Sequence, residues 1–65
     1  MGELITKANI ADADQFYEDL IEAHADLSED ESQALNSRLI LILANHVGDM
    51  QVLAQALHAA RAKAR

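Results

Sequence analysis

Residues 28–48 read SEDESQALNSRLILILANHVG, and this stretch decides the fold. It begins with a capping box, because the Ser28 hydroxyl can accept from the Glu31 backbone N–H while the Glu31 carboxylate accepts from the backbone N–H of Ser28. Acids in a first turn also suit the positive end of the helix dipole. Gly48 is the residue type that ends helices in the left-handed conformation. The sequence therefore predicts a helix over residues 29–46, roughly 27 Å long.

The middle of this helix is apolar on every side. Residues 39–44 read LILILA, which is more than one full turn. A helix that is apolar all round has to be covered all round, and two short neighbouring helices can cover about two thirds of it. The rest requires the N-terminal segment or a second molecule. The run can also be read as a buried strand, but the capping box and the helical spacing of Asn36, Arg38 and Asn45 favour a helix.

Two further helices flank the central one. Asp12 is a good N-cap for a helix over residues 13–25, with Gln15 completing a capping-box pattern. Asp49 is a good N-cap for a helix over residues 50–63. The first of these helices has an apolar face made of Phe16, Leu20, Ala23 and Leu27. The last has an apolar stripe made of Met50, Leu53, Leu57 and Ala60.

The segment before the first helix has no helical or strand period. We read residues 1–11 as an extended lead-in whose apolar side chains fold back onto the helices. The predicted fold class is therefore all-α, a small three-helix bundle in one domain, residues 1–65. A chain of this length buries only about 60% of its unfolded surface, so oligomerisation or docking onto a partner is the expected supplement.

Composition excludes several kinds of protein. The chain has no Cys and no Pro, only two Gly, and two aromatic residues, Phe16 and Tyr17. Disulfides, thiolate chemistry, glycine-rich phosphate loops and a base-stacking platform are therefore absent. A net charge of −6 repels nucleic acids and anionic membranes. No apolar run is long enough to span a bilayer and no signal peptide is evident, so we expect a cytoplasmic protein.

Charge is divided unevenly along the chain. Residues 1–31 hold ten acids and one base, whereas residues 32–65 hold one acid and four bases. In an up-down-up bundle the end of the last helix lies beside the start of the middle one. Arg61, Lys63 and Arg65 would then face the acids at 29–31, each exposed pair contributing about 0.2–1 kcal/mol. The same asymmetry can instead orient an antiparallel dimer or a basic partner.

The three histidines are the only plausible metal ligands or general bases. His24 and His46 lie at opposite ends of the predicted middle helix, so one chain cannot bring all three imidazoles to a single ion. A small-ligand or metal site using His24 and His58 is a less favoured alternative. We predict no catalytic residue, no metal and no cofactor. Three short, Ala-rich helices are expected to leave little volume for a substrate cleft.

The candidate interaction residues lie mainly on the middle helix. Arg38 interrupts an apolar stretch and needs an acidic partner, either within the chain or on another protein. Asn45 and His46 adjoin the turn at Gly48, where a structural role in ending the helix and a role in binding are both open. The full set of candidate contact residues is Tyr17, Arg38, Ile40, Leu41, Asn45 and His46.

These observations favour a non-enzymatic protein–protein interaction module. It would act as a homodimer or as a small accessory subunit of a larger enzyme. The alternative is a free-standing structural or regulatory homo-oligomer with no enzyme partner. The two differ in self-association, because an accessory subunit exposes apolar surface when it is alone and a homo-oligomer does not.

Several short motifs carry a resemblance across residues 9–60. They are Asn9-Ile10-Ala11-Asp12, Phe16-Tyr17-x-x-Leu20-Ile21-x-x-His24, Leu35-Asn36-x-Arg38-Leu39 and Leu43-Ala44-Asn45-His46-x-Gly48-Asp49. In these the chain resembles a bacterial family of short proteins catalogued only as a domain of unknown function. The resemblance implies a stand-alone bacterial protein. It also implies an association with flavin-dependent oxidoreductases, which would favour an accessory subunit, and it assigns no catalytic residue.

Overall fold

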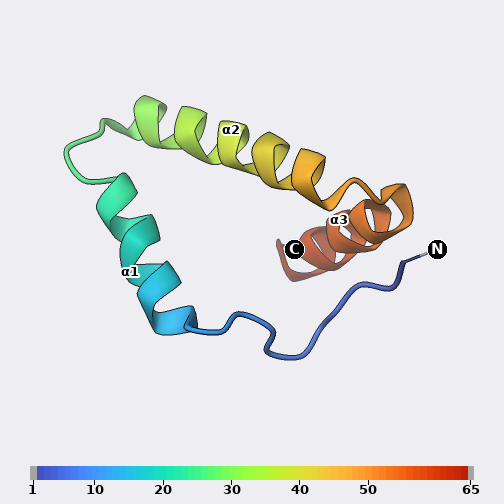
Figure 1. Ribbon diagram of the computed structural model, residues 1–65. Coiled ribbons are helices and arrows are strands. Elements are labelled where there is room, and N and C mark those ends of the chain that lie inside the picture. The colour runs from blue at the N-terminus through green and yellow to red at the C-terminus, as the bar shows by residue number, and fades with distance from the viewer. Residues whose placement is uncertain (1, 65) are drawn as a thin grey trace.

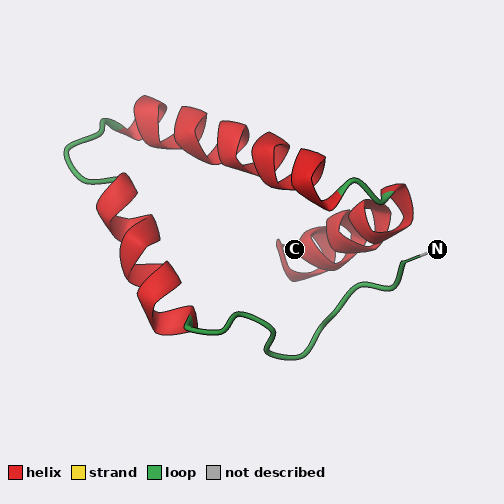
Figure 2. Cartoon of the chain, viewed as in Figure 1, coloured by secondary structure: helices red, strands yellow, loops and turns green. Residues whose placement is uncertain are grey.

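The computed structural model describes residues 2–64, which form three α-helices and, within that range, no strand (Figure 2). The helices are α1 (Ala13–Ala23), α2 (Glu29–Val47) and α3 (Met50–Ala64). The prediction of a small, all-α three-helix fold is confirmed, and the bounds of α2 and α3 agree with it to within one residue. None of the described helices combines the length and the apolar character needed to cross a membrane.

The helix starts follow the predicted capping chemistry. In the capping box of α2, the Ser28 Oγ accepts from the Glu31 N–H at 3.2 Å and the Glu31 carboxylate accepts from the Ser28 N–H at 2.9 Å. At the start of α1, Asp12 accepts from the backbone of Gln15 at 3.0 Å. The Gln15 side chain donates to Asp19 at 2.9 Å instead of returning to the cap. The reciprocal hydrogen bond from Gln15 back to Asp12 does not form, so this part of the predicted capping box is wrong. The Gln15 side-chain amide is held instead by the Asp19 carboxylate, one turn further along the helix.

The first helix ends earlier than predicted, at Ala23 rather than residue 25. Asp26 has a left-handed backbone with φ 65°, and the Leu27 N–H donates to the His24 carbonyl at 3.2 Å. This tight turn redirects the chain into α2. The second turn is shorter, because only Gly48 (φ 69°) and Asp49 separate α2 from α3.

The start of the lead-in lies beside α3 (Figure 1), but Ile5 and Ile10 are 61% and 58% exposed, so the expectation that its apolar side chains fold back onto the helices holds only for Leu4. The Leu4 N–H donates to the Gln55 side chain at 3.1 Å, and the Gln55 amide donates to the Gly2 carbonyl at 3.3 Å. A Cβ at Gly2 would lie 2.6 Å from a methyl of Val52, so the backbone here lies almost against α3. The half-buried residues on this side of the molecule are Gly2, Leu4, Ala44, Asp49, Val52, Leu53 and Ala56.

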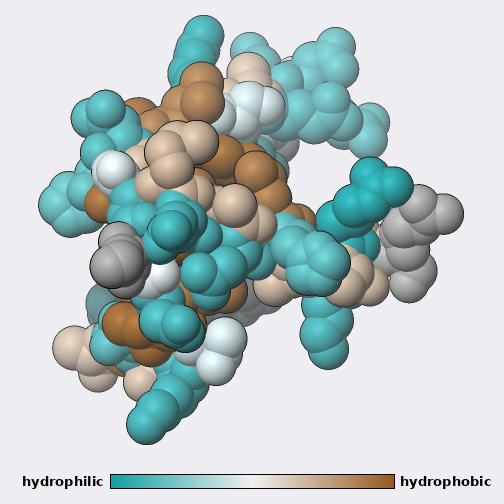
Figure 3. All heavy atoms as spheres, turned by 90° about the vertical axis from the view of Figure 1, so that its right-hand side faces the viewer, coloured by the Kyte–Doolittle hydropathy of each residue, from teal (hydrophilic) through white to brown (hydrophobic). Residues whose placement is uncertain are grey.

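The helices do not close around a core. No residue among those described is buried, and α2 with α3 is the only helix pair whose Cα atoms come within 8 Å at several positions. The radius of gyration is 13.4 Å, against about 10.7 Å for a compact domain of this length. On the side that carries the α2–α3 turn, apolar side chains are open to solvent between hydrophilic ones (Figure 3). The bundle is therefore an open one.

Within residues 2–64, the ion pairs expected of Arg61 and Lys63 with the acids at 29–31 do not form, because α3 does not return along α2. Figure 1 shows the end of α3 well apart from the start of α2. Arg61 and Lys63 consequently lie far from the acids at 29–31, and Arg65 lies outside the described residues. The physical reason is the turn at Gly48 and Asp49, which points α3 toward the lead-in instead.

Candidate interaction surface

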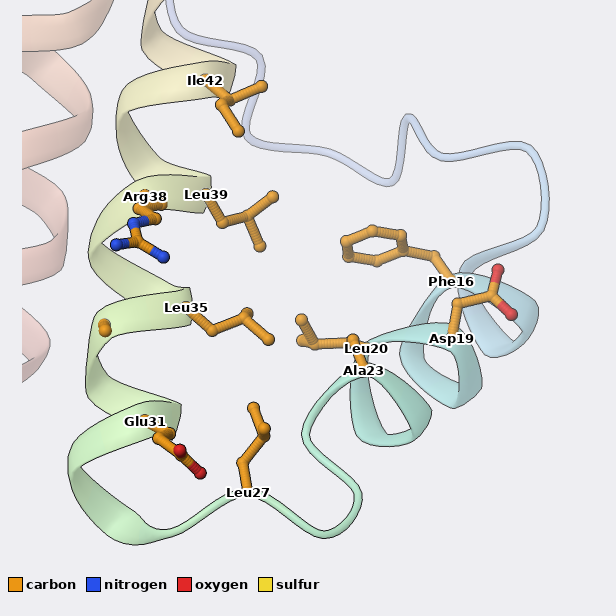
Figure 4. Close-up of a pocket in the computed structure, with 11 residues that line it drawn as sticks. Phe16, Asp19, Leu20, Ala23, Leu27, Glu31, Leu35, Arg38, Leu39 and Ile42 are labelled. Atoms are coloured by element: carbon orange, nitrogen blue, oxygen red, sulfur yellow. The ribbon is translucent and has the colours of Figure 1, made fainter.

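An apolar groove separates α1 from α2 (Figure 4). Its volume is about 700 Å³. We call it the α1–α2 groove, and its lining is Phe16, Asp19, Leu20, Ala23, Leu27, Glu31, Ala34, Leu35, Arg38, Leu39 and Ile42. The expectation that three short helices leave little volume for a cleft is therefore wrong. The cause is the wide angle between α1 and α2 (Figure 1), which keeps their backbones apart.

The floor of the α1–α2 groove is built by leucines from both helices. In Figure 4, Leu20 points toward Leu35, and Phe16, one turn earlier in α1, points toward Leu39. Leu20, Leu35 and Leu39 are half-buried, whereas Ile42 at the upper end is exposed over 64% of its surface. The groove therefore has an apolar floor and is open to solvent along its length. This shape suits an apolar segment laid along the groove better than a small molecule enclosed in it.

Three charged side chains lie along this apolar surface. Asp19 comes from α1, and Glu31 and Arg38 come from α2. Glu31 already accepts the cap hydrogen bond of Ser28 through one carboxylate oxygen. The arrangement brings no nucleophile and base together, and it offers charges that can orient a bound segment.

A histidine outside the groove lining links α1 to α2. Nδ1 of His24 donates to the Leu20 carbonyl at 2.7 Å, and Nε2 lies 3.0 Å from the side-chain amide oxygen of Asn36. With Nδ1 carrying the proton, Nε2 accepts from Asn36 when that amide presents its NH₂ group. Both ring nitrogens are thus engaged within the chain. Among residues 2–64 no group of three or more His, Cys, Asp or Glu side chains is placed to hold a metal ion.

The structure brings only one predicted contact residue, Arg38, into the α1–α2 groove. Tyr17, Ile40 and Leu41 are 65%, 63% and 70% exposed on other faces of α1 and α2. Asn45 and His46 are exposed in the last turn of α2, beside the Gly48 N–H that donates to the Ala44 carbonyl at 2.9 Å. His58 is exposed on α3.

Sequence reasoning assigned the groove residues to internal packing and so missed them as a site. The signal was present in Phe16, Leu20, Ala23 and Leu27, which recur at helical spacing on α1. What the spacing does not show is that this face meets its neighbour only along one edge. Ile40 and Leu41, where the sequence places the surplus apolar surface, are exposed as well, so the groove adds to that surface and does not replace it.

Comparisons with known proteins place the chain in a family without placing it in a pathway. No curated protein matches the chain, and no solved structure matches it. One family profile matches residues 4–62, nearly all of the molecule. The resemblance seen in the motifs at residues 9–60 is thereby confirmed. The chain belongs to the family described as "Protein of unknown function (DUF2783)".

Proposed function

We propose that this chain is a non-enzymatic protein–protein interaction module whose helices complete their core only when another protein covers them. The observation that carries the proposal is the exposed surface. The chain exposes 6003 Å² at a mass of 7.1 kDa, whereas a folded monomer of that mass is expected to expose about 4,100 Å². The difference is surface that a compact chain of this size would have removed from water.

The size of that excess matches a permanent interface. Roughly 1,900 Å² per chain lies well above the ~800 Å² per partner of an ordinary stable complex, and within the range of obligate ones. The surface is also apolar at well-exposed positions such as Ile42, Met50 and Leu57, which are 64%, 77% and 70% exposed. Apolar patches of this kind mark interaction sites on soluble proteins.

The chemistry of the surface favours a protein partner in the cytoplasm. The net charge of −6 disfavours nucleic acids and anionic membranes. The acids lie mainly in the first half of the chain and the bases in the second half. A partner with bases opposite the acidic first half and acids opposite the basic second half would be complementary in charge to the whole chain.

The test is the solution mass and radius of gyration of the purified chain across a wide concentration range. Light scattering and small-angle X-ray scattering should show self-association, or an expanded monomer with a radius of gyration near 13.4 Å that binds another protein. A monomer near 10.7 Å that unfolds cooperatively at the lowest concentration would contradict the proposal, because its own helices would then cover the apolar surface.

A further inference from the structure

An exposed stripe runs along α3 on a face that the lead-in leaves uncovered. It consists of Met50, Ala54, Leu57 and Arg61, which recur at intervals of four, three and four residues. Such intervals keep side chains on one side of a helix. All four residues are exposed, whereas Val52, Leu53 and Ala56, on the side of the lead-in, are half-buried. We call the exposed set the α3 stripe.

The α2 wall of the groove repeats the same spacing in the opposite direction. Read backwards from Ile42, it presents Ile42, Arg38, Leu35 and Glu31. Both rows cover about 17 Å of helix axis at 1.5 Å per residue. When the two rows are laid antiparallel, apolar residues meet at two levels. A small residue then lies opposite the long Arg38 side chain, and residues of opposite charge meet at one end.

From this match, and resting on the proposed function, we infer that a second copy of this chain seats its α3 stripe in the α1–α2 groove, antiparallel to α2. The partner copy's Leu57 then packs beside Leu35, and its Ala54 leaves room for the Arg38 side chain. The arrangement is reciprocal, since each copy offers one groove and one α3. A two-fold axis therefore satisfies both copies and closes the assembly as a dimer.

The charges favour this direction over the reverse one. Arg61 and Lys63 stand in the last turn of α3, and Glu29, Asp30 and Glu31 stand in the first turn of α2. Antiparallel seating brings these cationic and anionic ends together and opposes the two helix dipoles. The reverse direction would place Arg61 one turn from Arg38 and leave the acids without a cation.

A chain cannot fill its own groove in this way without rebuilding a turn. Only two residues join α2 to α3, and both are held, Gly48 by its N–H to Ala44 and Asp49 by accepting from the Gln51 and Val52 N–H groups. The hydrogen bonds of Gln55 then hold α3 against the lead-in. In Figure 4, α3 lies on the side of α2 away from the groove. A second copy reaches the groove without changing either turn.

The area agrees with a second copy as the occupant. An excess of about 1,900 Å² per chain is what an obligate dimer of small subunits removes. A short peptide in one groove would leave the α3 stripe uncovered. The reciprocal dimer covers the groove and the stripe of both copies at once, so it accounts for both exposed features with one contact.

Cysteine cross-linking tests this arrangement cleanly because the chain has no Cys of its own. A Leu35→Cys chain labelled with ¹⁵N is mixed with an unlabelled Leu57→Cys chain and mildly oxidised, and the mixed disulfide is identified by its mass. The matched control replaces Leu35→Cys by Leu41→Cys, which lies on the same helix outside the groove. A second pair, Ile42→Cys with Met50→Cys, tests the other end of the register at two exposed positions.

We expect each groove pair to give at least tenfold more mixed disulfide than the Leu41→Cys control. Equal yields, or disulfides formed mainly between two Leu41→Cys chains, would overturn the seating while leaving a self-associating module in place. An expanded monomer at every concentration would overturn the second copy and leave the proposed function intact. A compact monomer would overturn both.

Discussion

His24 and Asn36 join α1 to α2 side chain to side chain, with 3.0 Å between Nε2 of the ring and the amide oxygen. They are twelve residues apart, on either side of the turn, and the other ring nitrogen is held by the Leu20 carbonyl. This hydrogen bond therefore acts with the turn at Asp26 in setting the angle between the groove walls. A change in that angle changes the width of the groove.

Removing this clasp should cost a measurable part of the stability. We expect His24→Ala and Asn36→Ala each to lower the free energy of unfolding, and their effects to be non-additive by about 0.5–1.5 kcal/mol, because they share one hydrogen bond. Urea unfolding of both single variants and the double variant gives the coupling. His58→Ala is the matched control, an exposed helical histidine that should change the stability by less than about 0.5 kcal/mol. Additive losses would mean that the two side chains act separately.

The turn between α2 and α3 depends on a left-handed glycine. Gly48 has φ 69°, and a Cβ there has space, with its nearest neighbour at 3.7 Å, so only the backbone conformation opposes a side chain. Gly48→Ala should destabilise the fold by about 1–2 kcal/mol, whereas Gly48→Asn should cost less because Asn tolerates this conformation. Thermal unfolding at fixed concentration measures both. Equal losses from the two variants would point to a clash rather than to backbone strain.

The lead-in is held to α3 through a close approach at Gly2. A Cβ there would overlap the Asp49 carboxylate and crowd Val52, so Gly2→Ala should lift the segment from the helix. Hydrogen exchange of the Leu4 N–H, which is now bonded to Gln55, should speed up several-fold. Gln55→Ala should produce the same change by removing the acceptor, and Ala8→Gly, in the same lead-in, is the control. Unchanged exchange in both Gly2→Ala and Gln55→Ala would show that the contact contributes nothing.

Two leucines on different faces of α2 distinguish between the possible contact faces. Leu35→Glu puts a charge in the floor of the α1–α2 groove and should weaken association at least about 30-fold, as expected for a central interface position. Leu41→Glu, outside the groove, should change it less than about threefold. Sedimentation across a dilution series gives both values. The opposite ranking would move the contact to the face of Ile40 and Leu41 that the sequence favoured.

The helices were predictable because their ends are set by residues that are close together in the sequence. Ser28, Glu31 and Gly48 act within a few residues of themselves, and the structure shows their hydrogen bonds as expected. The early end of α1 was harder to predict, because it depends on the left-handed backbone of Asp26. Asp tolerates this conformation but does not require it.

The arrangement of the helices was not predictable in the same way. Helical spacing shows which side of α1 is apolar, but it does not show whether α2 will meet that side along its whole length. Besides the two turns, the outcome involves contacts between residues far apart in the sequence, the His24–Asn36 clasp and the Gln55 hydrogen bonds to the lead-in. Neither leaves a pattern in a single sequence, so the groove was missed and the position of Arg61 was wrong.

The lack of any buried residue between positions 2 and 64 has a consequence for the life of the protein in a cell. A chain stabilised by association gains stability by mass action as its partner becomes more abundant. Newly made copies that find no partner remain open to proteases, which draw on the unfolded population. The steady level of this protein should therefore follow the supply of its partner, and overproduction alone should yield mostly degraded chain until the concentration supports pairing.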